Sequence, residues 1–200
     1  MAVRRVVAVL GVIAMLSVVG SAATALVHRP ARTPAGSAPQ WLRAHGLEVA
    51  VPGTRWRLEP TTSAVQYADA SGAVRAQVNA PAVLDAGFCP SSRSSSRAFV
   101  GLLPPQQGKV PAVVNGQLGT WAVAIGGVPI PLPAVTGSRA DIDVHVPAGP
   151  CQPTTAHLTL VGRATSAGVV VLVLVRDVGE PHDLSAAAAD RIVQSLRSRT

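Results

Sequence analysis

The stretch GVVVLVLVRD, residues 168–177, decides the fold of this 200-residue chain. It contains seven consecutive aliphatic residues, Val169 to Val175. Because alternate side chains of a strand point to opposite faces, aliphatic groups lie on both faces of this strand, and both faces must be covered. We therefore predict a central strand inside a sheet, with further layers packed against it.

The segment that follows, residues 183–197, predicts an amphipathic helix. Its apolar residues recur at helical spacing: Leu184, Ala188, Ile192, Val193 and Leu196. Asp183 or Ser185 is the candidate N-cap, and Arg197 falls near the C-terminal end of the helix dipole. A single apolar stripe indicates that this helix lies on one face of the sheet.

The residues before the central strand add two more strands. Between Arg139 and Val146, apolar residues alternate with Asp141, Asp143 and His145, and residues 155–164 form a second strand. Short connections join these strands to residues 168–177, so we predict a three-stranded antiparallel unit.

The sequence also predicts β-strands in the N-terminal half of the domain. Short strands are predicted at residues 47–51 and 55–58, and residues 64–69 and 73–79 form a predicted hairpin.

The stretch from Pro111 to Ile125 predicts a helix with proline in its first turn, although Gly116 and Gly119 each weaken it by about 1 kcal/mol relative to alanine. The proline-rich residues 126–133 are expected to be extended.

Together these patterns predict an α+β fold, an antiparallel sheet of five to seven strands with helices packed on it, over residues 41–200.

The N-terminus has the pattern of an export signal. MAVRR precedes the uncharged run Val6 to Val27, which is long enough for one apolar helix across a membrane. The run also reads as a cleavable signal peptide with Ala23-Thr24-Ala25 as its small-x-small site. The favoured interpretation is an uncleaved anchor, with residues 28–40 as a proline-rich tether and an extracytoplasmic C-terminal domain; the alternative is secretion after cleavage.

Composition argues against nucleic acid as a partner. Lysine and arginine number 17, of which only Lys109 is lysine, and a formal charge of +7 falls to +5 once residues 1–27 are set aside. The basic residues form no polybasic run, and the six aromatic residues do not alternate with arginine. The arginine content is interpreted as coding bias rather than as a binding surface.

The two cysteines, Cys89 and Cys151, each lie beside a proline in a predicted loop. In an exported chain they are expected to form a disulfide, whereas a reactive thiol is the less favoured alternative. The SSRSSSR run after Cys89 is interpreted as a solvated loop, with an anion site made by Arg93 and Arg97 as the alternative.

One strand face carries candidate metal ligands. Asp141, Asp143 and His145 share a face, and His157 on the neighbouring strand could complete the set. Alternation against a buried face produces the same pattern, so these residues are interpreted as solvated and no cofactor is expected. No known catalytic, phosphate-binding or dinucleotide-binding motif occurs in the sequence.

The order AGFCPSSRSSSRAFVG, Trp121-Ala122, Cys151, VLVLVRDVG and ADRIVQSLR resembles an actinobacterial envelope domain of unknown function with a PsbP-like extracytoplasmic fold. The resemblance covers about residues 46 to 198. It implies an α+β sandwich, an N-terminal membrane segment and a disulfide between Cys89 and Cys151, but no reaction. Between Lys109 and Val135 the sequence departs from the resemblance, which expects a longer alanine-rich helix.

These observations predict a non-catalytic envelope module that binds a partner protein or an envelope ligand, with the cell membrane as a further partner through the N-terminal segment. The alternative hypothesis is a metal-assisted extracytoplasmic enzyme that uses the face of Asp141, Asp143 and His145.

Overall fold

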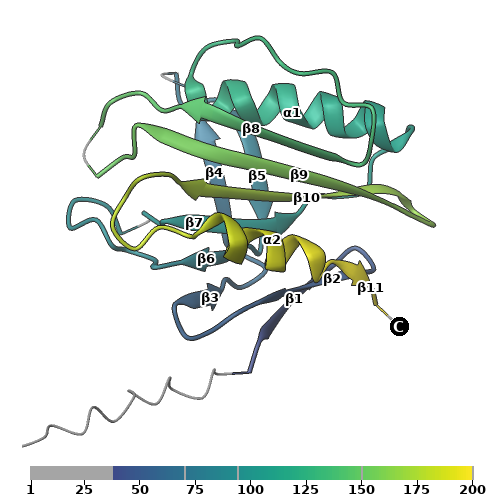
Figure 1. The fold of residues 1–200 in the computed structure, drawn as a ribbon, viewed down its shortest axis with the longest axis horizontal. Helices are drawn as coiled ribbons and strands as arrows, with labels where there is room; N and C mark the ends of the chain where they lie inside the picture. The colour runs from purple at the N-terminus through teal and green to yellow at the C-terminus, as the bar shows by residue number, and fades with distance from the viewer. Residues whose placement is uncertain (1–37, 70, 94, 150, 200) are drawn as a thin grey trace, which may run out of the picture. The chain divides into compact units, whose positions relative to one another are not determined.

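The computed structural model describes residues 38–69, 71–93, 95–149 and 151–199 (Figure 1). The predicted N-terminal apolar helix, including the anchor from Val6 to Val27, lies outside the described residues, as does the tether up to residue 37. In the described part of the chain, no helix is both long and apolar enough to cross a membrane. Gln40, the last residue of the predicted tether, is the first residue of a strand.

The elements alternate between long runs of strand and single helices. In chain order they are β1 (Gln40–Ala44), β2 (Leu47–Val51), β3 (Trp56–Leu58), β4 (Ala64–Ala68), β5 (Val74–Asn79), β6 (Ala82–Leu84), β7 (Ala98–Leu102), α1 (Val110–Gly126), β8 (Arg139–His145), β9 (Thr155–Thr165), β10 (Gly168–Asp177), α2 (Ala186–Gln194) and β11 (Arg197–Ser198).

The largest sheet is antiparallel and has six strands in the order β3-β6-β7-β10-β9-β8. The predicted central strand, β10, lies between β7 and β9. Its residues Val170 to Leu174 are completely buried. The prediction that both faces of residues 168–177 are covered is therefore confirmed.

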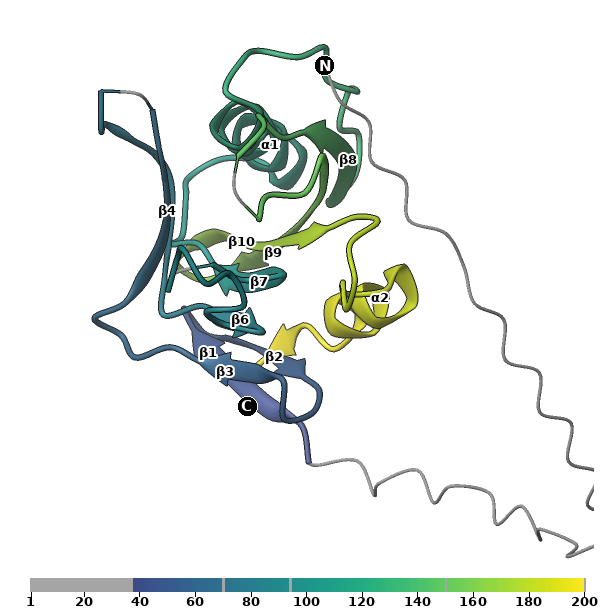
Figure 2. The same ribbon diagram turned by 90° about the vertical axis from the view of Figure 1, so that its left-hand side faces the viewer.

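Each face of the six-stranded sheet carries its own layer. Val169, Val171 and Val173 of β10 pack in one cluster with α1 and the β4–β5 hairpin. Val170, Leu172 and Leu174 pack in a second cluster with α2 and the small sheet β1-β2-β11. Figure 2 shows β4 and α2 on opposite sides of β6, β7, β9 and β10. The alternation within one strand thus builds two separate hydrophobic cores.

The predicted internal helix is confirmed and slightly longer than expected, although glycines and prolines stand where the resemblance expects alanines. It begins after Lys109, with Pro111 in its first turn, and ends at Gly126. The next residue, Gly127, caps the helix with a φ of 74°, the left-handed conformation that favours glycine. Leu118 and Trp121 are buried on its inner side, while Gly116 has open space around it.

The C-terminal helix is confirmed, with a different end. Ser185 is the N-cap, and its hydroxyl accepts a 3.3 Å hydrogen bond from the Ala188 backbone N–H. The helix ends at Gln194 rather than near Arg197. After it, the Ser195 hydroxyl accepts a hydrogen bond from the Ala50 N–H, and residues 197–198 pair with β2 as strand β11. Arg197 stacks 4.2 Å above the Trp41 ring.

The predicted fold class is confirmed as α+β, with antiparallel sheets and two helices packed on them. The predicted hairpin and the β8-β9-β10 unit are also present. Four strands were not predicted: β1, β6, β7 and β11. Each of these four strands has five residues or fewer, which is too short to show a clear periodic pattern.

A pair of glycine substitutions tests how closely α1 packs on the sheet. A methyl group at Gly162 of β9 would lie 2.7 Å from Val114 Cγ2 and 2.8 Å from Val110 Cγ1. We expect Gly162→Ala to lower the free energy of unfolding by about 1 to 3 kcal/mol through overpacking. Gly116→Ala, on the exposed side of α1, should raise it by up to about 1 kcal/mol. Urea denaturation of both variants checks this, and equal effects would contradict the packing described.

Candidate functional site

The candidate metal ligands of β8 are only partly brought together. The alternation of β8 is as predicted, with Asp141, Asp143 and His145 all exposed. The His157 ring lies between two carboxylates, its Nδ1 2.6 Å from Asp143 Oδ1 and its Nε2 3.6 Å from Asp141 Oδ1. His145 lies at the end of the strand opposite Thr155, so it does not join this group.

Asp141 is already bound by protein donors. Arg139 donates two hydrogen bonds to it, of 2.6 and 2.9 Å, and the Thr159 hydroxyl donates a third of 2.8 Å. Although burial opposes the shift, hydrogen bonds from His157, Arg139 and Thr159 lower the pKa of Asp141. The Asp141 hydrogen bond in turn raises the pKa of His157. Within the described residues, no group of three or more His, Cys, Asp or Glu side chains could hold a metal ion.

This charged group also reaches the second helix. Arg139 forms a 2.9 Å ion pair with Asp190 of α2, and so connects the edge strand β8 to the helix that covers the sheet. We therefore interpret the network around Asp141 as a link between α2 and the sheet edge.

The disulfide between Cys89 and Cys151 is confirmed, with the two Cα atoms 5.8 Å apart and 62 positions apart in sequence. Both cysteines of the chain are used, so the alternative of a reactive thiol is wrong. The bond joins the serine-rich loop after β6 to the loop between β8 and β9. These two loops form walls of the same cavity.

The serine-rich loop is ordered by its own hydrogen bonds. The Ser95 hydroxyl accepts a bond of 2.9 Å from the Cys89 N–H and donates one of 2.7 Å to the Ser92 carbonyl. The interpretation of the whole run as a solvated loop is therefore only partly correct, because Ser95 and Ser96 are half-buried and line a cavity.

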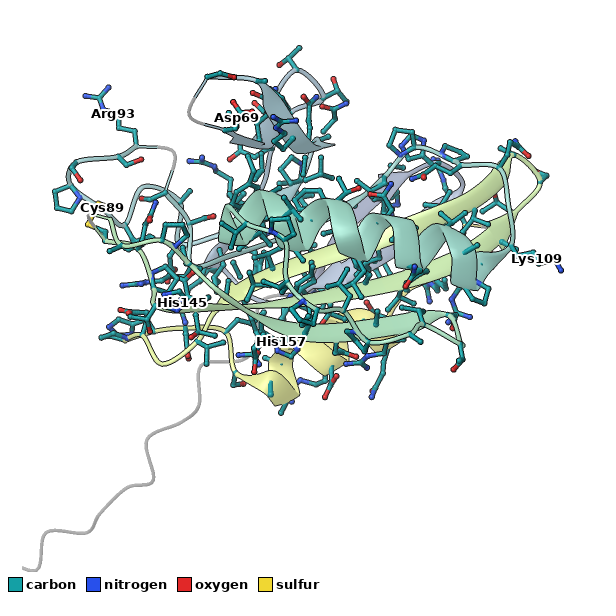
Figure 3. All side chains as sticks on the ribbon, turned by 90° about the horizontal axis from the view of Figure 1, so that it is seen from above. Asp69, Cys89, Arg93, Lys109, His145 and His157 are labelled. Atoms are coloured by element: carbon teal, nitrogen blue, oxygen red, sulfur yellow. A yellow bond between two sulfur atoms is a disulfide. The ribbon has the colours of Figure 1, made fainter. Side chains whose placement is uncertain are left out.

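The two arginines of this loop have different environments. Arg97 is half-buried, binds Asp177 at 3.1 Å and Glu180 at 3.5 Å, and stacks 3.8 Å from the centre of the Phe88 ring. Arg93 is exposed, and its side chain points away from the body of the molecule (Figure 3). Because carboxylates neutralise Arg97 and Arg93 points away from it, the alternative of an anion site made by Arg93 and Arg97 is not supported.

One cavity, called the disulfide cavity below, has a volume of about 280 Å³ and lies between strand β4 and the two disulfide-linked loops. The side chains of its apolar walls include Val65, Phe99, Ile125 and Val175. Seven of the seventeen lining residues are polar, and they are serine, glutamine, tyrosine and aspartate residues. A concave site that combines apolar walls with polar groups is typical of sites for small ligands.

Three aromatic rings support one wall of this cavity. Tyr67 and Phe99 line it, and Trp121 of α1 packs behind them, with ring centroids 5.8 to 6.2 Å apart in tilted and edge-on arrangements. Such pairs stabilise by about 0.5 to 1.5 kcal/mol beyond their buried area. The cluster connects the hairpin, the central sheet and α1, so this wall is rigidly held.

The polar end of the cavity is formed by Tyr67 and Asp177. Burial, together with the negative charge of Asp177, raises the pKa of the Tyr67 phenol. Burial also raises the pKa of Asp177 to about 6, although Arg97 opposes this shift. Among the described residues, none forms a hydrogen bond with the Tyr67 hydroxyl. A protonated phenol is thus available as a donor to a ligand.

Sequence reasoning did not find this cavity. Its lining comes from segments around residues 65–67, 88–99, 125, 146–156 and 175–177. Each segment is unremarkable by itself, and only the disulfide and the neighbouring strands bring them together. The pairing of Cys89 with Cys151 was the one available signal, since it places the two loops side by side.

The fold and cavity define an α+β domain with two hydrophobic cores and a small ligand-sized cavity beside its disulfide. Residues 30–200 match the family described as Domain of unknown function (DUF8017), and the chain belongs to this family. A comparison with curated proteins found no match.

The raised pKa of Asp177 predicts a specific pH dependence of stability. The pKa of Asp177 is about 6 in the folded protein and 3.8 ordinarily, so the folded state favours the protonated carboxyl. The contribution of this group to the free energy of unfolding is therefore fully present below pH 3.8 and is lost as the pH rises through 6. We expect the free energy of unfolding of the natural protein to fall relative to that of Asp177→Asn between pH 4.5 and 6.5. Urea denaturation at several pH values measures this difference, and parallel profiles for the two proteins would contradict it.

Proposed function

We propose that this domain is a non-catalytic binding module and that the disulfide cavity is its ligand site. The observation that supports this most directly is the combination of apolar walls with an unpaired phenol at one end. The ligand group in the cavity would be apolar, of a size that fits 280 Å³, and would carry a hydrogen-bond acceptor for the Tyr67 hydroxyl.

The architecture supports binding in a second way. The cavity walls are held by the disulfide and by the aromatic cluster of Tyr67, Phe99 and Trp121. A site whose walls are fixed before binding loses less conformational entropy when a ligand enters. Walls that are formed before binding suit a site that recognises its ligand by shape.

We place this module in the cell envelope as part of the same proposal. The uncharged run from Val6 to Val27 supports export, with the domain either tethered to the membrane or released after cleavage. The disulfide is consistent with an oxidising compartment. The PsbP-like fold and the actinobacterial source stay predictions from the resemblance.

The alternative hypothesis of a metal-assisted enzyme has no specific observation in its favour. Its candidate residues are held by one another and by Arg139 and Thr159, and His145 lies apart from His157. Asp141 would have to exchange its guanidinium partner for a metal ion.

The binding proposal is tested by adding small apolar fragments to the ¹⁵N-labelled full chain. We expect indole, 4-ethylphenol or cyclohexylmethanol to shift the amide resonances of Gln66, Tyr67 and Gln152, because these residues line the cavity. Gln152→Trp should abolish the shifts by filling the mouth of the cavity from an exposed loop position.

The matched control is Gln194→Trp, the same substitution at an exposed position of α2. It should bind the fragments as the natural protein does. Fragment shifts that map to other surfaces, or that persist unchanged in Gln152→Trp, would overturn the assignment of the ligand site.

A further inference from the structure

Aromatic side chains gather at the disulfide cavity. The sequence has three tryptophans, one tyrosine and two phenylalanines. The tyrosine and both phenylalanines line the cavity, as Tyr67, Phe88 and Phe99, and Trp121 packs behind two of them. The face of an aromatic ring carries partial negative charge, so a cation held against such a ring is stabilised.

The formal charge in the cavity wall is also negative. Among the described residues that line the cavity, Asp177 is the only carboxylate, and none is lysine, arginine or histidine. Asp177 is buried, and its Oδ2 accepts a hydrogen bond of 3.1 Å from Arg97. In the part of the chain that the structure describes, no donor contacts its Oδ1. One oxygen of this carboxylate is thus free to pair with a group of a ligand.

The surroundings of Asp177 contain more negative than positive charge. Arg97 lies 3.1 Å from Asp177 and 3.5 Å from Glu180, so one guanidinium serves two carboxylates. The negative charge of Asp183 also acts on Asp177. Because these carboxylates outnumber the one cation, the electrostatics at this end of the cavity favour a second cation.

Arg97 shows how a cation is held in these surroundings. Its guanidinium carbon lies 3.8 Å from the centre of the Phe88 ring, while one of its nitrogens binds Asp177. Arg97 itself is not among the residues that line the cavity. Over the described ranges, no cation lies above the rings of Tyr67 or Phe99. These two rings are therefore available to a cation that enters the cavity.

We propose that the ligand of the disulfide cavity contains an organic ammonium group. The ammonium would lie near Asp177, with its carbon substituents against the aromatic rings, and an oxygen of the ligand would accept the hydrogen bond of the Tyr67 hydroxyl. Aromatic rings bind quaternary ammonium ions through this combination of apolar contact and charge. This inference rests on the proposed function, because it names the chemical class of the ligand in the same cavity.

Three compounds of similar shape and different charge test the inference. Choline is a cation, 3,3-dimethylbutan-1-ol is its uncharged analogue, and 3,3-dimethylbutanoate is an anion of similar size. Binding to the ¹⁵N-labelled full chain at pH 7.5 is measured from the amide shifts of Tyr67 and Gln152, which line the cavity. We expect choline to bind about tenfold more tightly than the alcohol. The anion should bind more weakly than either.

Asp177→Asn removes the charge and keeps the shape of the side chain. In this variant choline and the alcohol should bind with equal affinity, and binding of the alcohol shows that the variant is folded. Asp143→Asn is the matched control, because the Asp143 side chain is 67% exposed and does not line the cavity. It should keep the preference of the natural protein for choline.

The pH dependence of binding supplies a second readout. The charged groups that act on Asp177 are Arg97, Glu180 and Asp183. The Tyr67 phenol, whose pKa is raised, stays protonated. Because the pKa of Asp177 is about 6, its carboxylate is mostly ionised at pH 7.5 and mostly protonated at pH 5.5. Between these pH values the affinity for choline should fall by about threefold. The affinity for the alcohol should not change, and the effect should be absent in Asp177→Asn.

The same titration with hexyltrimethylammonium identifies the source of the ammonium group. Tighter binding than that of choline would assign the group to the head of an amphiphile. Weaker binding would assign it to a free small cation, and both results support the inference.

Two outcomes would overturn the inference. They are equal affinity of the natural protein for choline and the alcohol, and an unchanged preference for choline in Asp177→Asn. If the alcohol still shifts the amides of the cavity in either case, the ammonium inference fails alone. If neither these compounds nor the apolar fragments bind, the proposed function fails with it.

Discussion

Burial of the aliphatic side chains of β10 from both sides is the constraint on which the rest of the structure depends. One strand supplies Val171 and Val173 to one core and Leu172 and Leu174 to the other. At roughly 1.5 to 3 kcal/mol for each fully buried aliphatic side chain, neither layer could be removed without exposing several such groups to water. The two-layer covering of the six-stranded sheet follows from this single run of sequence.

The candidate site is a consequence of the same arrangement. The layer that contains α1 and the β4–β5 hairpin covers one face of β10, but the hairpin pairs with no strand of the main sheet. Its inner residues Val65 and Tyr67 pack against the core, and residues of β4 and of the serine-rich loop line the disulfide cavity together. The disulfide fixes that loop to the opposite wall. Core packing and the covalent link thus leave the disulfide cavity between them.

The parts of the fold that sequence predicted are those with strong local patterns. The doubly apolar run of β10, the alternation of β8 and the apolar stripe of α2 each contain enough residues to define a period. Strands such as β6 and β11 have three and two residues, and form because neighbouring strands offer hydrogen-bonding partners. Their existence is a tertiary effect, so local sequence contains little trace of it.

The candidate site was less predictable for a related reason. Asp141, Asp143 and His145 were singled out because they alternate along one strand, with His157 as a possible fourth member. The structure places His157 against Asp141 and Asp143 but leaves His145 opposite Thr155, outside the group. The disulfide cavity depends on Tyr67, Phe88 and Asp177, which are distant in sequence and meet only after the sheet has formed. Register and loop position, rather than motif, decide which side chains meet.

Native-state hydrogen exchange of the full chain at increasing urea concentrations tests the central role of β10 most directly. The account predicts that amides of β10 exchange only through global unfolding, with the largest free energies of opening in the domain, while amides of the β4–β5 hairpin exchange through a smaller, local opening. Exchange of β10 amides at lower free energy than those of the hairpin would contradict it.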